Sequence, residues 1–471
     1  MTTPVAPFVP NENGDTSDLR TPVSAIGSES NYHPLHAANG GRAWSHIELL
    51  GGEPVTTALT ESHLGLHARA ASDSRLAVMR GYIDAGRLPF FRSMQSAAGP
   101  TAVVDGTRRI MLGANNYLGL CGDPRLVEAA TDATRHYGPS CSSTPPFCGT
   151  FAIKSELEAV LADWHGTEAA LVYNSGYAAN VGALTALLGA TDLALLDTEA
   201  HASIHAGVRL SGANTRSFEH NDTAALHRVL ALGAERPGLK LVAIDGLYSM
   251  QGDMAPMRTI ADLADRYGAG ILVDEAHSVG VFGATRTGVA EEFGCAPRVE
   301  VRMGALSKGP GCTGGYIAGS GDLIDLLRLH SGAHLFSTTA SPGAIAASVV
   351  SVGIMRSAEG ADRAAAALRN AARLRDGLHR HGLSVSPGVV RADGSTAVAP
   401  NVAIQIGDEA RAVEIWNRVF DRGVYCALAI APAVREDGAM LRASVCADHA
   451  DAQLDTAIEV LAEAMSEAEA A

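Results

Sequence analysis

The feature that most constrains the fold is an alternation of short apolar, β-branched runs with helical stretches between residues 121 and 340. Short apolar runs bounded by turn residues are typical of buried strands, and the stretches between them carry apolar residues at helical spacing. This rhythm predicts a mostly parallel sheet covered by helices. The predicted strands are Ala169–Tyr173, Leu193–Leu196, Leu239–Ile244, Gly270–Val273 and Val299–Met303, and the predicted helices are Ala178–Leu188, Ala224–Leu232 and Met257–Tyr267.

The chain divides into four predicted parts. Residues 1–45 are rich in Pro, Ser, Thr, Asn and Gly without apolar periodicity, which predicts a disordered extension. Residues 46–120 form an N-terminal segment that leads into a large domain over residues 121–340. Residues 341–471 form a smaller α+β domain.

The two parts on either side of the large domain, residues 46–120 and 341–471, also contain predicted helices or strands. The last helix has apolar residues on one face. Its charged residues are all acidic, so we expect a solvated acidic face. The other predicted elements are a strand pair at Ala102–Val104 and Thr107–Leu112, a long helical stretch over Ala344–His381, and strands near Val398–Ile406 and Ala439–Val445.

Charge and cysteine content exclude several classes of protein. The chain has 471 residues with 36 basic and 51 acidic side chains, a net charge of −15, which disfavours a nucleic-acid or anionic-membrane binder. Its seven cysteines show no C-x-x-C or paired zinc-ligand spacing, and an odd number suits a reducing compartment. Without signal-peptide features or a long apolar stretch, we expect a cytoplasmic protein with no membrane span.

A lysine lies between a predicted strand end and a glycine-rich turn, in the segment Gly304–Gly311. Partial desolvation lowers the pKa of a lysine and prepares it to form a Schiff base, and small neighbours let a planar cofactor approach. Taken alone, this segment is more often an exposed loop. Lys308 therefore needs support from the rest of the chain.

That support begins with Asp274, which ends a predicted strand at the sheet edge where open α/β folds bind ligands. A buried carboxylate needs a cationic partner, and the protonated pyridine nitrogen of pyridoxal phosphate would be one. His277 could then reach the phenolic oxygen of the ring. The letters Asp-Glu-Ala-His also match a helicase box, but the sequence contains no G-x-x-x-x-G-K-[ST] loop, so a helicase is excluded.

Three further segments carry residue patterns that occur in ligand-binding sites. Tyr173–Asn180 fits a strand, a tight turn and a helix N-terminus, whose free N–H groups would hold a phosphate. His201 and His205 lack the glutamate of H-E-x-x-H, so no metal site is expected, and a histidine stacked on a flat ring fits better. Gly309–Gly314 is formally G-x-G-x-x-G but does not open a helix, which disfavours a dinucleotide site.

From about Phe90 to the end, roughly four fifths of the chain, the sequence resembles the α-oxoamine synthases. The order and spacing of the matching segments are highly specific. The resemblance implies a fold-type I pyridoxal-phosphate transferase, with a large mostly parallel sheet domain and a smaller C-terminal α+β domain, acting as a homodimer. The matching segments are Asn115–Leu120, Ser175–Asn180, His201–Ile204, His220–Asp222, Tyr248–Asp253, Asp274–Ser278, Ser307–Lys308 and Gly314–Gly319.

The resemblance also implies a role for each matching residue. Lys308 would hold pyridoxal 5'-phosphate covalently and later move the α-proton, Asp274 would pair with the pyridine N–H, and His201 would stack on the ring. The remaining implied contacts are His277 and Ser249 to the ring oxygen, Gly176, Tyr177 and Ser307 to the phosphate, Ser337 and Thr338 to the phosphate from the neighbouring subunit, and Arg442 and Asn115 to the amino-acid carboxylate.

The chain departs from the family pattern at several positions. Ala305 stands where a threonine usually binds the phosphate. Pro145 and Pro146 replace an arginine and a residue that in some members contacts a succinyl carboxylate, so a free dicarboxylic acyl group is disfavoured. Lys154 replaces a histidine, and Asp245 replaces a strand-end glutamate.

The reaction implied by the resemblance joins serine, alanine or glycine to an acyl thioester, carried by coenzyme A or an acyl carrier protein, with loss of CO₂ and formation of an α-amino ketone. An aminotransferase or an aldolase on the same fold is the alternative. A scaffold without activity is disfavoured because Lys308, Asp274 and His201 are all present.

Overall fold

The computed structural model describes residues 65–470, so the predicted disordered extension over residues 1–45 lies outside the described residues. The chain divides into two compact units, with the boundary between Leu88 and Pro89. The described part of the first holds α1 (Leu66–Ala71) and α2 (Ser74–Asp84). Asp73 caps α2 by accepting a hydrogen bond from Leu76 N at 2.8 Å.

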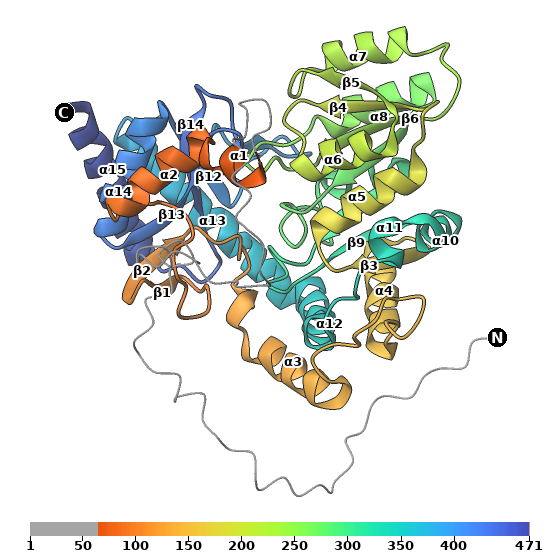
Figure 1. Cartoon of the computed structure of the whole chain (residues 1–471), viewed down its shortest axis with the longest axis horizontal. Coiled ribbons are helices and arrows are strands. Elements are labelled where there is room, and N and C mark those ends of the chain that lie inside the picture. The colour runs from red at the N-terminus through yellow and green to blue at the C-terminus, as the bar shows by residue number, and fades with distance from the viewer. Residues whose placement is uncertain (1–64, 471) are drawn as a thin grey trace, which may run out of the picture. The chain divides into compact units, whose positions relative to one another are not determined.

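The second unit contains a seven-stranded sheet in the order β3-β9-β8-β7-β6-β4-β5 (Figure 1). Strand β9 pairs antiparallel with both of its neighbours, and the other pairings are parallel. This confirms the mostly parallel sheet, although β5 and β9 were not among the predicted strands. The strands are β3 (Ala169–Tyr173), β4 (Leu193–Asp197), β5 (Asn214–Phe218), β6 (Lys240–Asp245), β7 (Gly270–Asp274), β8 (Val301–Ala305) and β9 (Gly315–Gly319).

Successive residues of the central strands enter different cores, because a strand's side chains alternate between the two faces of a sheet. Val242 and Val273 pack on one face, whereas Ala243 and Leu272 pack on the other. The first face is covered by α4 (Ala152–His165), α7 (Thr223–Leu232), α8 (Met257–Tyr267) and α12 (Pro342–Arg356), and the second by α5 (Gly176–Leu187), α6 (Ala202–Ser211) and α10 (Gly321–His330).

A second, five-stranded sheet combines strands from both ends of this unit. The predicted strand pair near residue 105 forms as expected, but β2 also pairs in parallel with β13, where Ile110 faces Val424. This segment is therefore built into the C-terminal sheet and does more than lead into the large domain. The sheet order is β1 (Thr101–Val104), β2 (Thr107–Leu112), β13 (Val424–Ala429), β14 (Ala439–Ser444) and β12 (Asn401–Gly407).

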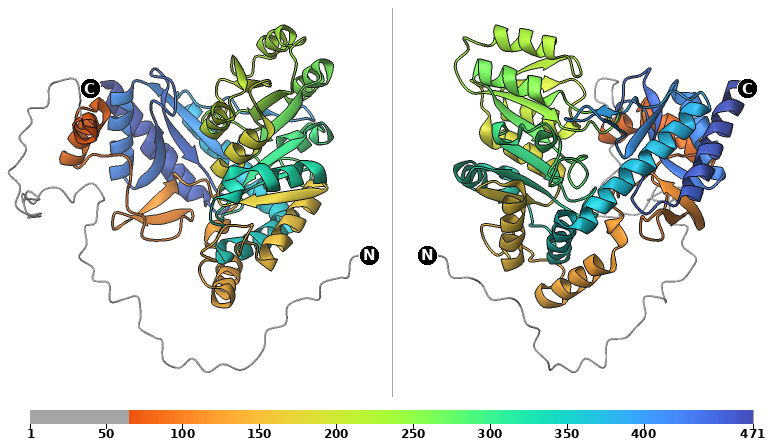
Figure 2. Two further views of the ribbon diagram at one scale, coloured as in Figure 1. Left: turned by 45° about the vertical axis from the view of Figure 1, so that its right-hand side comes forward. Right: turned by 180° about the vertical axis from the view of Figure 1, so that it is seen from behind.

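The predicted helical stretch from residue 344 to 381 consists of two consecutive helices. Helix α12 ends at Arg356, and Ser357 begins α13 (Ala358–Arg380) by accepting a hydrogen bond from Gly360 N. The two helices lead from the large sheet to the small one (Figure 2).

The acidic face of the last helix, α15 (Asp451–Ala470), is only partly the solvated face that was expected. Arg373 of α13 pairs with Asp455 at 2.7 Å, and Arg422 pairs with Glu467 at 2.7 Å. The remaining elements are η2 (Leu120–Gly122), α3 (Pro124–Tyr137), α9 (Val289–Glu292), η3 (Ala296–Arg298), α11 (Gly332–Leu335), β10 (Val389–Val390), β11 (Thr396–Ala397) and α14 (Glu409–Asp421). Across residues 65–470, no helix combines the length and apolar character needed to cross a membrane.

Candidate active site

Three polar side chains lie where strands of the large sheet end. Asp274 is the last residue of β7, Lys308 follows β8 by three residues, and His201 begins α6 after β4. Since the carboxyl ends of parallel strands meet at one edge, the topology brings these side chains together. Asp274 and Lys308 both act electrostatically on His201, which confirms their proximity.

The Asp274 carboxylate is buried and held by two donors. Its Oδ2 accepts from Asn180 Nδ2 at 2.7 Å, and its Oδ1 accepts from Ala276 N at 2.9 Å. Asn180 also donates to Ser203 Oγ at 2.9 Å. The carboxylate is therefore fixed in position as an acceptor at the sheet edge.

Lys308 lies in an environment that favours its neutral amine. Burial lowers the pKa of Lys308, and the negative charges of Asp274 and Asp245 only partly oppose this effect. The chain has three lysines in all: Lys154, which forms an ion pair with Glu158, Lys240 at the start of β6, and Lys308. Among them only Lys308 lies within the charged cluster described above.

His201 is held at both its main chain and its ring. Its backbone N donates to Asp245 Oδ1 at 3.0 Å, and its Nδ1 lies 2.7 Å from Ser203 Oγ. Burial lowers the pKa of His201. Burial and the negative charge of the neighbouring Asp274 raise the pKa of Asp245 well above its usual value, which favours the neutral acid form of Asp245.

The small sheet contributes a guanidinium to the same cluster. Arg442 of β14 is 7% exposed, and its Nη2 donates to Asn115 Oδ1 and, at 3.2 Å, to Tyr117 Oη. Its Nε is buried and has no hydrogen-bond partner among the described residues. The charges of Arg442 and Lys308 both act on His277, which is also buried. A buried guanidinium with a spare donor is suited to a carboxylate.

A tight turn between β3 and α5 provides free backbone donors. Ser175 caps α5 by accepting from Ala178 N at 3.1 Å. The N–H groups of Gly176 and Tyr177 lie in the first turn, where no carbonyl of the helix can accept them. A Cβ added to Gly315 would lie 2.5 Å from Gly176 N, so only glycine lets β9 pass this close to the turn. Gly176 and Gly315 thus shape an anion-binding helix terminus.

Ser337 and Thr338 lie against this turn in their own chain. Asn174 Nδ2 donates to Ser337 Oγ at 2.8 Å and more weakly to the Thr338 carbonyl at 3.4 Å. The expected route to the phosphate was from a neighbouring subunit. One chain by itself already brings the segment to the turn, and its role across subunits stays a prediction.

Two serines were expected to contact the cofactor, Ser249 and Ser307. No described interaction of their hydroxyls links them to the charged cluster. Ser249 is half-buried, and its main-chain carbonyl accepts from Asn401 Nδ2 at 2.9 Å. Ser307 is exposed, next to Lys308. Their roles in cofactor binding stay predictions.

A histidine clamp supports the loops around the site. His220 Nδ1 lies 3.0 Å from Asp197 Oδ1, and its Nε2 lies 2.8 Å from Asp253 Oδ2. Burial alone lowers the pKa of His220, but hydrogen bonds and charges from the two carboxylates outweigh it and raise the pKa to about 10. The imidazolium ties the end of β4, which precedes His201, to the loop that carries Ser249.

This clamp predicts a loss of stability in alkali. Since the pKa of His220 is raised in the folded chain, its stabilisation is complete below the unfolded value near 6.5 and is lost as pH rises through about 10. Between pH 6.5 and 10, the melting temperature of the wild type should fall by several degrees more than that of His220→Gln. Parallel pH dependences of the melting temperature in the two proteins would contradict this assignment.

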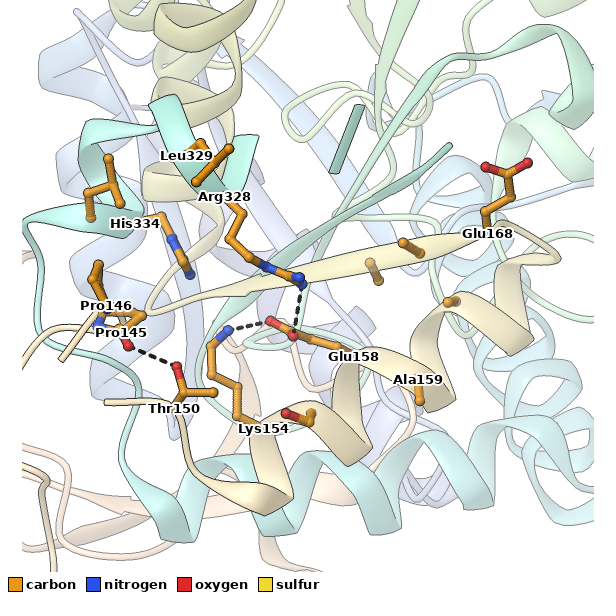
Figure 3. A pocket seen from close by; sticks show the side chains of 15 residues that line it. Pro145, Pro146, Thr150, Lys154, Glu158, Ala159, Glu168, Arg328, Leu329 and His334 are labelled. Atoms are coloured by element: carbon orange, nitrogen blue, oxygen red, sulfur yellow. Dashed lines mark hydrogen bonds and ion pairs between the residues drawn. The ribbon is translucent and has the colours of Figure 1, made fainter. Parts of the chain in front are cut away.

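A cavity of about 560 Å³ is lined by residues of α4 and α10 (Figure 3). Three of the residues that depart from the family pattern also line it. Pro145 and Pro146 line it, together with Lys154, whose buried ammonium pairs with Glu158. Arg328 also approaches Glu158, at 3.5 Å. Lys308 is not among the lining residues, so this cavity is separate from the charged cluster at the sheet edge.

Comparisons with known proteins agree with this architecture. Residues 107–461 match the family described as "Aminotransferase class I and II". Serine palmitoyltransferase of Caulobacter vibrioides is 38% identical over 81% of this chain and 92% of that protein, and 8-amino-7-oxononanoate synthase 1 of Bacillus velezensis is 36% identical over 80% and 93%. The solved serine palmitoyltransferase from S. paucimobilis, with a bound PLP-myriocin aldimine, has a TM-score of 0.80 and 30% identity over 85% and 99%.

The chain therefore belongs to the aminotransferase class I and II family of pyridoxal-phosphate enzymes. Within that family it is one of the α-oxoamine synthases, the group of its named relatives.

The residues present fit pyridoxal phosphate. The lowered pKa of Lys308 suits a covalent bond to the aldehyde. The Asp274 carboxylate, fixed in position, suits a protonated ring nitrogen. The turn at Gly176, kept open by Gly315, suits the phosphate. Across residues 65–470, no group of three or more His, Cys, Asp or Glu is placed to hold a metal ion.

Sequence reasoning assigned no role to two residues of this site. Tyr117 lies inside the matching segment Asn115–Leu120, and Asn180 ends the matching segment Ser175–Asn180. Both are polar side chains on otherwise apolar or small stretches, which is a usable signal. Only the contacts of the folded chain reveal their partners, His277 and Asp274.

The departure at residue 305 predicts a gain in cofactor affinity when it is reversed. Ala305 is buried, with its Cβ 3.2 Å from where a Cβ on Gly176 would lie, so its side chain faces the phosphate turn without a hydroxyl. In Ala305→Thr, one added hydrogen bond to a phosphate, about 1.4 kcal/mol, should lower the cofactor dissociation constant roughly tenfold. Cofactor titration of the apoprotein checks this. Ala305→Val controls for shape, and equal affinities in the two variants would refute the prediction.

Proposed function

We propose that this chain condenses an amino acid with an acyl thioester and releases CO₂, giving an α-amino ketone. In this reaction the α-carbon of the amino acid loses its proton and bonds to the acyl carbon, the thiol leaves, and the carboxyl group departs as CO₂. Bound pyridoxal phosphate supplies the electron sink that makes the α-proton acidic. The named relatives, serine palmitoyltransferase and 8-amino-7-oxononanoate synthase, support this assignment.

The observation that carries the proposal is the placement of Arg442 beside Lys308. Arg442 acts on Lys308 electrostatically and retains an unpartnered, buried Nε. The guanidinium would bind the amino-acid carboxylate, with Asn115 fixing its orientation. Lys308, whose pKa is lowered by burial, would take up the α-proton, while His201 would cover the cofactor ring and Asp274 would hold its nitrogen.

Thiol release tests the proposal. Protein loaded with pyridoxal phosphate is incubated with serine, alanine or glycine and with palmitoyl or succinyl thioesters of coenzyme A and acyl carrier protein. We expect equal amounts of free thiol and CO₂ with one amino acid. Because of Pro145 and Pro146, we expect the palmitoyl thioester to be preferred over the succinyl one. An aminotransferase or aldolase would release neither product, so turnover without thiol would overturn the proposal.

A homodimer in the cytoplasm is the proposed setting. Phe336 is 84% exposed beside the Ser337 contact with the phosphate turn, and Tyr177 is 52% exposed at that turn. Large apolar side chains exposed next to an active site favour a partner surface. All seven cysteines are free, which is compatible with a reducing compartment. Light scattering of the purified protein is expected to give the mass of two chains.

A further inference from the structure

Tyr117 connects two residues of the site that come from different sheets. It is fully buried in the loop after β2. Its hydroxyl lies 2.7 Å from His277 Nδ1, 3.2 Å from Arg442 Nη2 and 3.3 Å from Asn115 Oδ1. One hydroxyl thus lies between the histidine expected at the cofactor ring and the guanidinium expected at the substrate.

The chemistry of Arg442 fixes the direction of one of these hydrogen bonds, and the distances favour a direction for the others. Arg442 can only donate, so the Tyr117 oxygen accepts from it. The single hydroxyl proton then has two acceptors to choose from, and the shorter contact, to His277 Nδ1, is the better one. Asn115 Oδ1 also accepts from Arg442 Nη2.

An acceptor at Nδ1 requires a neutral imidazole with its proton on Nε2. The surroundings agree, because burial lowers the pKa of His277 well below its usual value and the positive charges of Lys308, Arg442 and His201 lower it further. The pKa of Tyr117 is raised by burial, so its hydroxyl keeps the proton it donates.

We propose that Tyr117 is a positioning residue that holds His277 in the Nε2–H form and couples its orientation to Arg442. His277 would then present a donor to the cofactor oxygen, and the Arg442 guanidinium would be held at the angle required by the substrate carboxylate. The effect of this role on turnover rests on the proposed function. The tautomer itself is a property of the protein alone.

The first test therefore uses apoprotein labelled with ¹⁵N-histidine. Among the 17 histidines, the signal of His277 is assigned by its loss in His277→Asn. We expect an unprotonated Nδ1 and a protonated Nε2 in the wild type. In Tyr117→Phe we expect a mixture of both tautomers. A wild-type His277 with its proton on Nδ1, or an unchanged tautomer in the variant, would overturn the proposal.

The second test separates positioning from general stability. Tyr316 is a matched control, since it is fully buried and its hydroxyl lies 2.8 Å from His165 Nε2. Tyr316→Phe should lower the melting temperature but leave the His277 signal and the amino-acid KM unchanged. Tyr117→Phe should raise the amino-acid KM about tenfold, with little change in the acyl-thioester KM. Equal effects of the two variants on KM would contradict the proposal.

Failure of this inference is distinguishable from failure of the proposed function. If no thiol is released with any substrate pair, the proposed function fails, while the tautomer of His277 in the apoprotein still decides the role of Tyr117. If condensation occurs but His277 carries its proton on Nδ1, only the present inference fails.

Discussion

Lys308→Ala is expected to abolish covalent attachment of pyridoxal phosphate and to lower the condensation rate by about 10³-fold or more. The reason is that one amine both holds the cofactor and takes up the α-proton, and no other lysine lies in the cluster around Asp274. Absorbance spectroscopy should show loss of the lysine-bound cofactor band. Borohydride reduction followed by peptide mass mapping should locate the label on Lys308 in the wild type.

The small number of lysines makes this test sharp. Lys240, at the start of β6, is the matched control, and Lys240→Arg should keep both the absorbance band and the activity. Lys154 is unsuited as a control because its buried ammonium pairs with Glu158. An unchanged spectrum in Lys308→Ala, or a label on either of the other lysines, would refute the assignment.

The second large effect is expected from Asp274→Asn, which should lower the rate by roughly 10²–10³-fold. Asn180 Nδ2 and Ala276 N each donate to one carboxylate oxygen, so an amide must turn its NH₂ group toward one of these donors. The variant also removes the negative charge that would keep the cofactor's ring nitrogen protonated. Cofactor affinity and turnover should both fall.

Asp245→Asn provides the comparison for this prediction. Asp245 lies opposite Asp274 on the neighbouring strand, but its raised pKa favours the neutral acid form. An asparagine carbonyl can still accept from His201 N, so we expect a loss of only about tenfold. Similar losses in both variants would show that the charge of Asp274 is not what matters at this site.

The large sheet was predictable because its signal is local. Each buried strand is a short apolar run, and its end at Asp274 follows from the place where the run stops. The strand β9 was missed although Gly315–Gly319 overlaps a matching segment, because a run rich in glycine has little strand signal. The break at Ser357 was missed because the residues on both sides of it favour helix.

The sequence by itself predicted the class of fold, because the alternation of strands and helices is a short-range pattern, and its resemblance to the α-oxoamine synthases implied the lysine, the aspartate and the kind of chemistry. Only the tertiary structure decided that β2 joins β13 and that Tyr117 connects Arg442 to His277. It also decided that the pKa of Asp245 is raised by burial and by the neighbouring Asp274, whereas Asp274 is held by donors from Asn180 and Ala276. Contacts between distant segments and the desolvation of a charged group depend on neighbours that local spacing does not specify.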